Sequence, residues 1–260
     1  MFWAVMLREF NADLHIHTCL SPCGSLDLSP RKIVEHAKME ALDIIAITDH
    51  NTARNVQVVM RLGEKEGVKV LPGLEVQSRE EIHLLTLFPD WTSAAGWADE
   101  VYQNLPPIKN EPEILGDQPV VDEDGNILEF EERLLLNSLS LSAEEIIHRV
   151  REGGGLTIPS HYNRGAFSLL SQLGFIPPDM PLEALEISRP RDLSPGEVWT
   201  DGVRIIPQIA SSDAHRLEDI GSGRTVLLLA EATLDELRLA LGRREGRRIV
   251  KFLHKPLDPL

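Results

Sequence analysis

Short, almost continuously apolar runs alternate with helical segments along most of this chain, and this alternation limits the folds it can adopt. The strand candidates are, in order, ADLHIH, LDIIAITDH, KVLPGLEV, IHLLTLF, GGLTIPSH, LEALEISR, RIIPQIASSDAH and TVLLLA. Such runs are typical of strands buried on both faces of a parallel sheet. Ser29-Pro30 predicts one helix start, and Ser142 with Glu145 predicts a capping box at another. The order of elements favours a parallel α/β architecture, most economically a closed barrel.

Two segments depart from this alternation. Residues 89–140, approximately, form a polar, proline-containing stretch in which QPVVDEDGNILEF places an Asp124-Gly125 turn between two β-prone arms, so we expect a hairpin. We interpret this stretch as an insertion in one domain that spans residues 1–260, and its place between two strands suggests either a flap over one end of the barrel or a mere elaboration. The tail DELRLALGRREGRRIVKF is expected to be an outer amphipathic helix with a solvated end.

Composition restricts the partners and the compartment. The 260 residues carry a formal net charge of −15 and two cysteines. Such an acidic chain is expected to repel long nucleic acid, although a small phosphate ester remains possible because bound cations reverse the local field. No apolar run approaches the ~20 residues that span a bilayer, and MFWAVMLREF lacks the features of a signal peptide. We therefore expect a cytoplasmic protein with no membrane partner.

The histidines gather at the ends of the predicted strands. Six of the nine lie there, namely His15, His17, His50, His83, His161 and His215. Three carboxylates, Asp49, Glu75 and Asp213, lie at similar positions. Active sites of parallel barrels form at the carboxyl ends of the strands, and imidazole with carboxylate suits zinc, manganese or iron. The pattern predicts two or three divalent ions at one rim. The remaining histidines, His36, His148 and His254, are expected to have no role in the site.

With these residues the chain resembles the PHP (polymerase and histidinol phosphatase) family of metal-dependent phosphoesterases. The matching motifs follow the family's order and are DLHIHT at 13–18, ITDHN at 47–51, GLE at 73–75, His83, PSH at 159–161 and SDAH at 212–215. The resemblance implies a distorted (β/α)7 barrel of the TIM-like kind, with a trinuclear metal site on its carboxyl rim.

The resemblance also implies which side chains hold each ion. The assignments are His15, His17 and Asp213 for the first ion, Glu75 as a bridge to the second with His83 and His161, and His50, His215 and Cys23 for the third. Family members often have histidine or an acidic residue where this chain has Cys23. A thiolate ligand there would favour zinc or iron over manganese, whereas a free cysteine would be a small buried apolar residue.

The expected activity is hydrolysis of a small phosphomonoester, or of a nucleotide or short oligonucleotide phosphate, by a metal-activated hydroxide. Asp213 or His215 would move the proton, and Arg164 and Arg189 either hold the substrate phosphate or are simply exposed to solvent. An amidohydrolase and a non-catalytic, metal-stabilised PHP module are the alternatives. The sequence names neither the substrate nor the oligomeric state.

Overall fold

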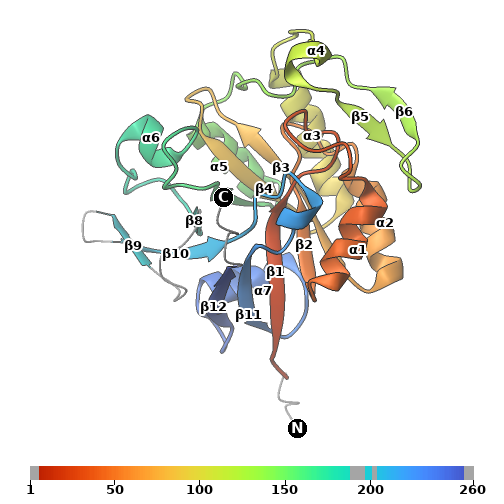
Figure 1. The fold of residues 1–260 in the computed structure, drawn as a ribbon. Helices are drawn as coiled ribbons and strands as arrows, with labels where there is room; N and C mark the ends of the chain where they lie inside the picture. The colour runs from red at the N-terminus through yellow and green to blue at the C-terminus, as the bar shows by residue number, and fades with distance from the viewer. Residues whose placement is uncertain (1–5, 188–196, 201–203, 255–260) are drawn as a thin grey trace, which may run out of the picture.

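A curved seven-stranded sheet forms the centre of the fold (Figure 1). The computed structural model describes residues 6–187, 197–200 and 204–254. The strands of the sheet lie in the order β12-β11-β1-β2-β3-β4-β7. Their bounds are β1 Arg8–Ile16, β2 Ile44–Ile47, β3 Lys69–Gln77, β4 His83–Leu87, β7 Leu156–Pro159, β11 Gly223–Leu229 and β12 Arg248–His254.

The directions of these strands differ in part from the parallel arrangement that the sequence predicts. β1, β2 and β3 are parallel, whereas β4 is antiparallel to both β3 and β7. β11 is antiparallel to β1 and to β12. The chain between β3 and β4 covers only the residues between Gln77 and His83, which is too short for the crossover that a parallel pair requires. Connection length therefore decides the direction of β4.

A second, three-stranded sheet continues the curvature of the first. It has the order β8-β10-β9, with β8 Leu185–Ile187, β9 Glu197–Thr200 and β10 Arg204–Ala210. The amide of Tyr162, just after β7, donates to the carbonyl of Glu186 in β8 at 2.8 Å. On the other side, Ile16 of β1 forms a parallel bridge with Ala214, just after β10. These contacts bring β8 and β10 between β7 and β1, and the predicted α/β class with a distorted, TIM-like barrel is confirmed.

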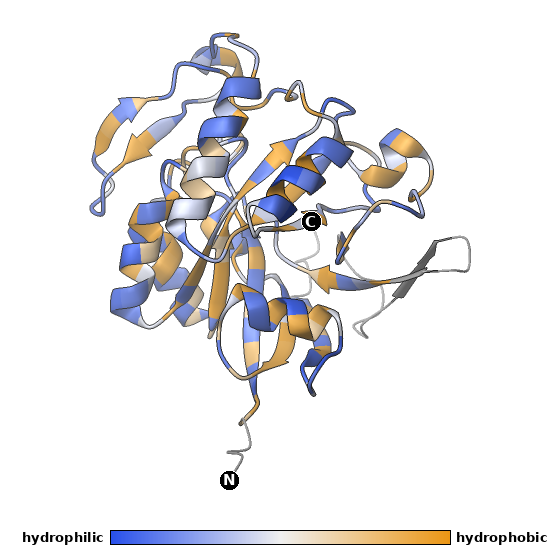
Figure 2. Cartoon of the chain, turned by 180° about the vertical axis from the view of Figure 1, so that it is seen from behind, coloured by the Kyte–Doolittle hydropathy of each residue, from blue (hydrophilic) through white to orange (hydrophobic). Residues whose placement is uncertain are grey.

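Helices cover the outside of the sheet. They are α1 Pro30–Met39, α2 Val56–Glu66, α3 Trp91–Asn104, α5 Ala143–Glu152, α6 Leu169–Leu173 and α7 Leu234–Leu241, with a short 3-10 turn at Leu217–Asp219. In Figure 2 the central strands are largely hydrophobic, while the helices around them carry many hydrophilic residues. The two predicted helix starts are found, since Pro30 begins α1 and Ser142 and Glu145 form a complete capping box on α5. Among the described residues, no helix is long and apolar enough to cross a membrane.

The stretch 89–140 contains the predicted hairpin and also two helices, α3 and α4 (Pro112–Leu115), that the sequence did not indicate. β5 Pro119–Val121 and β6 Ile127–Phe130 pair antiparallel, and the short helix α4 precedes them. Asp90 starts α3 by accepting a hydrogen bond from the amide of Ser93. The hairpin turn contacts the outer helices, because Asp124 pairs with Arg31 of α1 at 2.9 Å and Glu123 pairs with Lys65 of α2 at 2.7 Å. That this stretch is an insertion stays a prediction.

The tail differs from the single amphipathic helix that the sequence predicts. α7 ends at Leu241, and RIVKFLH forms β12 at the edge of the sheet. Gly246 has a φ of 81° in the turn that leads into β12, a conformation that glycine adopts without strain. The expectation of a solvated helical end is therefore wrong, because this turn returns the basic segment to the sheet beside β11.

Candidate metal centre

Glu75 of β3 lies at the centre of a group of imidazole rings. The residue is 1% exposed. Its carboxylate oxygens lie 3.2–3.5 Å from ring nitrogens of five histidines, at 3.4 Å for His15, 3.5 Å for His17, 3.3 Å for His50, 3.2 Å for His83 and 3.5 Å for His161. These histidines come from the ends of β1, β2, β4 and β7, so the curvature of the sheet brings four strands to one carboxylate.

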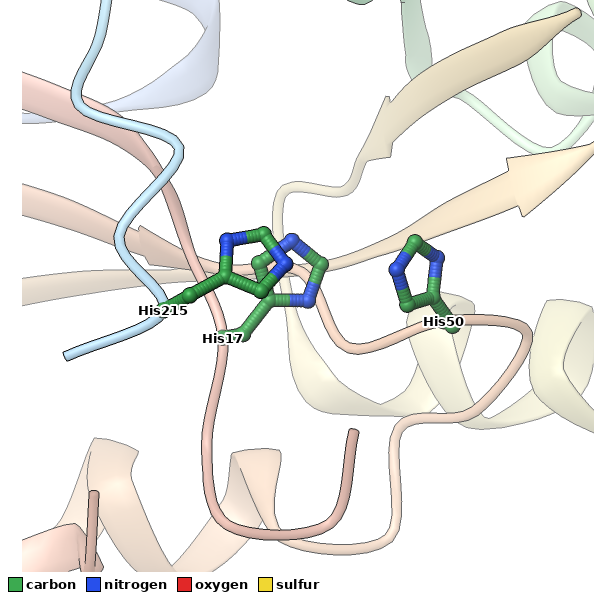
Figure 3. A group of neighbouring side chains, drawn as sticks. All are labelled: His17, His50 and His215. Carbon is green, nitrogen blue, oxygen red and sulfur yellow. The ribbon is translucent and has the colours of Figure 1, made fainter. Parts of the chain in front are cut away.

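Asp213 and His215 approach the same group from the segment that follows β10. The Oδ1 atom of Asp213 lies 3.3 Å from His15 Nε2 and 3.4 Å from His17 Nε2. The ring of His215 lies 4.3 Å from that of His17, measured between centroids. Figure 3 shows His17, His50 and His215 facing one another from three separate segments. Asp213 has a φ of 53°, a left-handed conformation that aspartate adopts more readily than most residues.

The ligand atoms of these residues form three overlapping groups, each with all atoms within 4.8 Å of one another. The groups are His17, His50 and His215; His15, His17, Glu75 and Asp213; and His50, Glu75 and His83. Buried atoms in this centre have no hydrogen-bond partner, namely Glu75 Oε1, His83 Nδ1 and His161 Nδ1. Buried polar atoms are normally satisfied, so these orphaned nitrogens and oxygen fit divalent cations with mixed imidazole and carboxylate ligands.

A buried carboxylate on β8 positions two of the histidines. Glu186 is 2% exposed, and its Oε2 lies 3.0 Å from His15 Nδ1 and accepts the backbone N–H of His161 at 2.9 Å. A carboxylate on the second ring nitrogen fixes the orientation of a metal-binding histidine. Sequence reasoning missed this role of Glu186, although a charged residue in the apolar run LEALEIS was the available signal.

Asp49, grouped with the ligand candidates in the sequence, instead holds the loop that carries His17. Its oxygens accept hydrogen bonds from the amide and hydroxyl of Thr18 and from the hydroxyl of Ser21, each at 2.7 Å. The Ser21 hydroxyl lies 3.0 Å from His17 Nδ1. Asp49 therefore reaches the metal centre through Ser21 and not by direct contact.

Burial and charge act in opposite directions on the pKa values of this centre. Burial lowers the pKa of His15, but the carboxylates of Glu186, Glu75 and Asp213 outweigh it and hold that pKa well above its ordinary value. Burial raises the pKa of Glu75 and of Asp213, yet the neighbouring histidines hold both well below the ordinary range. For His50, burial dominates and lowers the pKa.

A cavity of ≈ 280 Å³ opens beside Asp213 and His215. Its wall includes Arg164, whose Nη2 donates to Asp213 Oδ2 at 2.7 Å. The remaining lining residues are His161, Glu186, Ile187, Ser211, Ser212, Asp219, Ser222 and His254. His254 of β12 therefore borders the cavity, although it was expected to lie apart from the site. Arg189, the second predicted phosphate-binding residue, lies outside the described residues.

Cys23 does not join any of the three ligand groups among the described residues. It is an exposed residue at the edge of the centre. Partial burial of the thiol and the nearby charges of Glu75 and Asp213 raise the pKa of Cys23 to about 12. Its assignment as a ligand stays a prediction.

Comparison with protein families supports the resemblance that the histidine motifs indicate. A model described as the PHP domain matches residues 13–138, and one described as PHP-associated matches residues 203–245. An uncharacterized protein of Methanocaldococcus jannaschii is 38% identical over 78 residues, which is 26% of this chain and 45% of that protein. A phosphoribosyl 1,2-cyclic phosphate 1,2-diphosphodiesterase of Eggerthella lenta is 31% identical over 80 residues, which is 29% of each.

Solved structures share the fold over nearly the whole chain. A lesion-specific endonuclease of Pyrococcus furiosus, endonuclease Q, matches with a TM-score of 0.64 and 22% identity, over 93% of this chain and 58% of that one. The chain thus spans less than two thirds of the relatives it matches. A structure of endonuclease Q in complex with a 27-mer duplex that carries an abasic lesion at the active site matches equally well.

This last structure overturns the expectation that excluded long nucleic acid as a partner. A fold of this kind holds a DNA duplex at its active site. The formal charge of −15 sums the whole surface, whereas binding of a phosphate depends on the charges beside it. Several of the negative charges lie in the metal centre, where bound cations would offset them.

The motifs, the barrel-like sheet and the two family models agree over most of the described chain. The chain contains a PHP domain at residues 13–138 and a PHP-associated segment at residues 203–245.

Proposed function

We propose that the protein is a metal-dependent phosphoesterase that hydrolyses phosphodiesters, with nucleic acid as the substrate class. The observation that carries this proposal is the buried carboxylate of Glu75 within 3.5 Å of five imidazoles, beside a cavity that contains an arginine. A barrel of this size does not need such a set of buried polar groups in order to fold. The set offers the ligands that clustered divalent cations need.

The proposed ligand sets are those that the resemblance implies. They are His15, His17 and Asp213; Glu75 with His83 and His161; and His50 with His215, joined by Cys23 if its thiol is deprotonated. When bound, the cations would act as Lewis acids on the phosphoryl oxygens and would lower the pKa of water toward neutrality. Glu186 and Asp49 keep the rings of His15 and His17 oriented for this role.

Arg164 is the proposed substrate-handling residue of the cavity. It uses one Nη atom on Asp213, so among the described residues its remaining N–H groups are available to a phosphate. Burial and the neighbouring His17 lower the pKa of His215, which keeps this ring neutral at pH 7, the form in which it can bind a cation.

Two relatives favour a phosphodiester over the phosphomonoester of the original expectation. Endonuclease Q cuts nucleic acid, and the E. lenta relative is named for a cyclic phosphodiester. Nucleic acid is preferred because endonuclease Q matches over 93% of the chain, whereas the diphosphodiesterase matches over 29%.

The experiment is a substrate panel assayed with Mn²⁺, Zn²⁺ and Fe²⁺ in turn. It comprises single-stranded DNA, duplex DNA with and without an abasic site, a cyclic nucleotide, and 5′-phosphorylated oligonucleotide for phosphate release. We expect metal-dependent cleavage of at least one DNA substrate that EDTA abolishes. Phosphate release alone would replace the phosphodiesterase proposal by a phosphatase, and inactivity toward every ester would favour the non-catalytic module.

A further inference from the structure

An exposed phenylalanine lies against one of the proposed metal-binding histidines. The Phe167 ring stacks on the His83 ring, with centroids 5.0 Å apart and an interplanar angle of 23°. The carbonyl of Phe167 also accepts the backbone N–H of His83 at 3.0 Å. Two contacts therefore fix this aromatic ring beside the metal centre.

Phe167 nevertheless remains 43% exposed. Most large apolar residues near the centre are buried, so this exposure is unusual for a ring in such a fixed position. Its backbone φ is 53°, which is unfavourable for a bulky side chain. This strained residue lies next to His83, and strained backbone conformations commonly cluster at functional sites.

The loop that presents Phe167 also presents a cation. Arg164 lies three residues earlier, is half exposed and borders the cavity. The Ser168 hydroxyl donates to the carbonyl of Arg164 at 2.6 Å, which links the two ends of this segment. His161, at the start of the loop, lines the cavity, and its ring lies 5.4 Å from that of His83. The loop thus presents a guanidinium at the cavity and an exposed aromatic ring beside His83.

This combination is the one that single-stranded nucleic acid requires. A phosphate is held by a cationic side chain, while a neighbouring base stacks on an aromatic ring. A base has a π-face whatever its identity, so such a contact is tolerant of sequence. If Phe167 only covered His83, an aliphatic side chain would serve equally well.

We propose that Phe167 is a stacking platform for a nucleobase next to the scissile phosphate, and that the loop 161–168 makes this phosphoesterase selective for nucleotidic substrates. The inference rests on the proposed function, since it specifies what flanks the phosphoester at the same centre. Phe167 is here a specificity-determining residue and takes no part in the chemical step.

The test compares a thymidine dinucleotide with two analogues that each lack one base. In one analogue a tetrahydrofuran abasic residue replaces the nucleoside on the 5′ side of the phosphodiester, and in the other it replaces the nucleoside on the 3′ side. For Phe167→Leu we expect KM for the full dinucleotide to rise by about tenfold, with kcat nearly unchanged, as loss of one stacked base predicts. At least one abasic analogue should show no such difference between variant and wild type. Phe167→Tyr should behave as wild type.

Phe175→Leu is the matched control, because Phe175 is 60% exposed beyond α6 and stacks on no histidine among the described residues. The Phe175→Leu variant should have the same KM and kcat as wild type for all three substrates. Bound metal per chain is measured for each variant to confirm that His83 keeps its place. A fall in kcat of equal size for the dinucleotide and both analogues would overturn the proposal and leave Phe167 as a positioning residue for His83.

A second measurement separates this inference from the proposed activity. Fluorescence anisotropy of the metal-loaded protein with a fluorescein-labelled, nuclease-resistant phosphorothioate single-stranded 10-mer reports binding without turnover. We expect wild type to bind and Phe167→Leu to bind about tenfold more weakly. If no ester is cleaved but this difference is seen, the proposed catalysis fails and the stacking platform stands. Equal affinities, or no binding by wild type, overturn the platform.

Discussion

Glu75 shows how a single buried carboxylate organises the chemistry of this protein. Its two oxygens are shared among five imidazoles, and one of them has no hydrogen-bond partner. Burying such a charge is costly unless it is compensated. Burial raises the pKa of Glu75, but the charges of His15 and His83 outweigh it and hold that pKa well below its ordinary value. Cations would take over this role.

Removing a ligand should therefore affect metal content before it affects folding. We expect His15→Ala or Asp213→Ala to lose at least one bound ion per chain and to reduce phosphoesterase turnover by about a hundredfold or more, because the assigned residues act as a unit. Metal content is measured by mass spectrometry after gel filtration, together with the circular dichroism spectrum.

The control is His148→Ala on the exposed side of α5, where the side chain is 58% accessible. This variant should keep both its metal and its turnover. Wild-type turnover in either ligand variant would contradict the assignment of the centre.

Asp13 supplies a pH dependence that is independent of catalysis. Burial raises the pKa of Asp13 to about 6, although the amides of Ser212 and Gly221 donate to its carboxylate. Between pH 4 and 6 the folded protein thus holds a proton that the unfolded chain has released. The free energy of unfolding should fall as pH rises through this window, by up to about 1.4 kcal/mol for each unit.

The Asp13→Asn variant removes this titrating group, because an amide does not ionise in this pH range. Urea unfolding of metal-free wild type and variant at pH 4, 5, 6 and 7 should show the stability difference moving in favour of the variant up to pH 6 and then levelling. A difference that is constant with pH would show that Asp13 does not titrate in this range.

At the scale of single residues, the sequence predicts what lies in a motif and misses what acts across the chain. The histidines at strand ends, Glu75 and Asp213 are recognisable because each follows a buried strand. The role of Glu186 depends on a partner 171 positions away, and nothing local indicates that pairing. Arg164 was found, but its contact with Asp213 was not, because a side-chain ion pair depends on the packed loop.

At the scale of elements, strand positions were predictable and strand directions were not. Apolar runs locate β1, β2, β3, β4, β7, β8, β10 and β11. Periodicity carries no information on whether a strand runs parallel or antiparallel to its neighbour, which depends on the connection. The sequence predicts the end of a helix here because RRIVKF continues an amphipathic pattern, but Gly246 interrupts that pattern and β11 supplies the hydrogen bonds that make the segment a strand.

The approach of β11 to the segment after β10 is a packing constraint that can be tested. A Cβ on Gly223 would lie 2.3 Å from the backbone oxygen of Ser211, two residues before Asp213. We expect Gly223→Ala to lower the free energy of unfolding by about 1–3 kcal/mol and to reduce turnover, because the backbone that presents Asp213 must shift.

Gly96→Ala is the contrasting substitution. Gly96 lies in α3, where an added Cβ meets nothing within 4 Å. This variant should gain up to about 1 kcal/mol in urea unfolding from better helix propensity and should keep full turnover. Equal effects of the two substitutions would contradict the crowding at Gly223.

At the scale of the whole molecule, cation binding should stabilise the entire fold, because the ligands come from β1, β2, β3, β4, β7 and the segment after β10. Chelation with EDTA should lower Tm by about 5–10 °C, the effect of losing ~3 kcal/mol of linkage in a domain of this size. Differential scanning calorimetry with and without EDTA, and after readdition of Mn²⁺ or Zn²⁺, checks this. An unchanged Tm would mean that the centre holds no tightly bound cation.

β1 pairs with β11, which is synthesised much later, and this separation affects how the protein folds during synthesis. The first strand sits in the interior of the sheet between β2 and a strand that begins at Gly223, and His17 meets a segment at Ala214. A ribosome adding about 5–20 residues per second needs roughly 10–40 s to make the ~200 residues between these partners. During that time one edge of β1 is unpaired and the histidines of the amino-terminal motif lack Asp213. The nascent chain can therefore complete its sheet and its ligand set only after the segment around Ala214 and the strand β11 have been made.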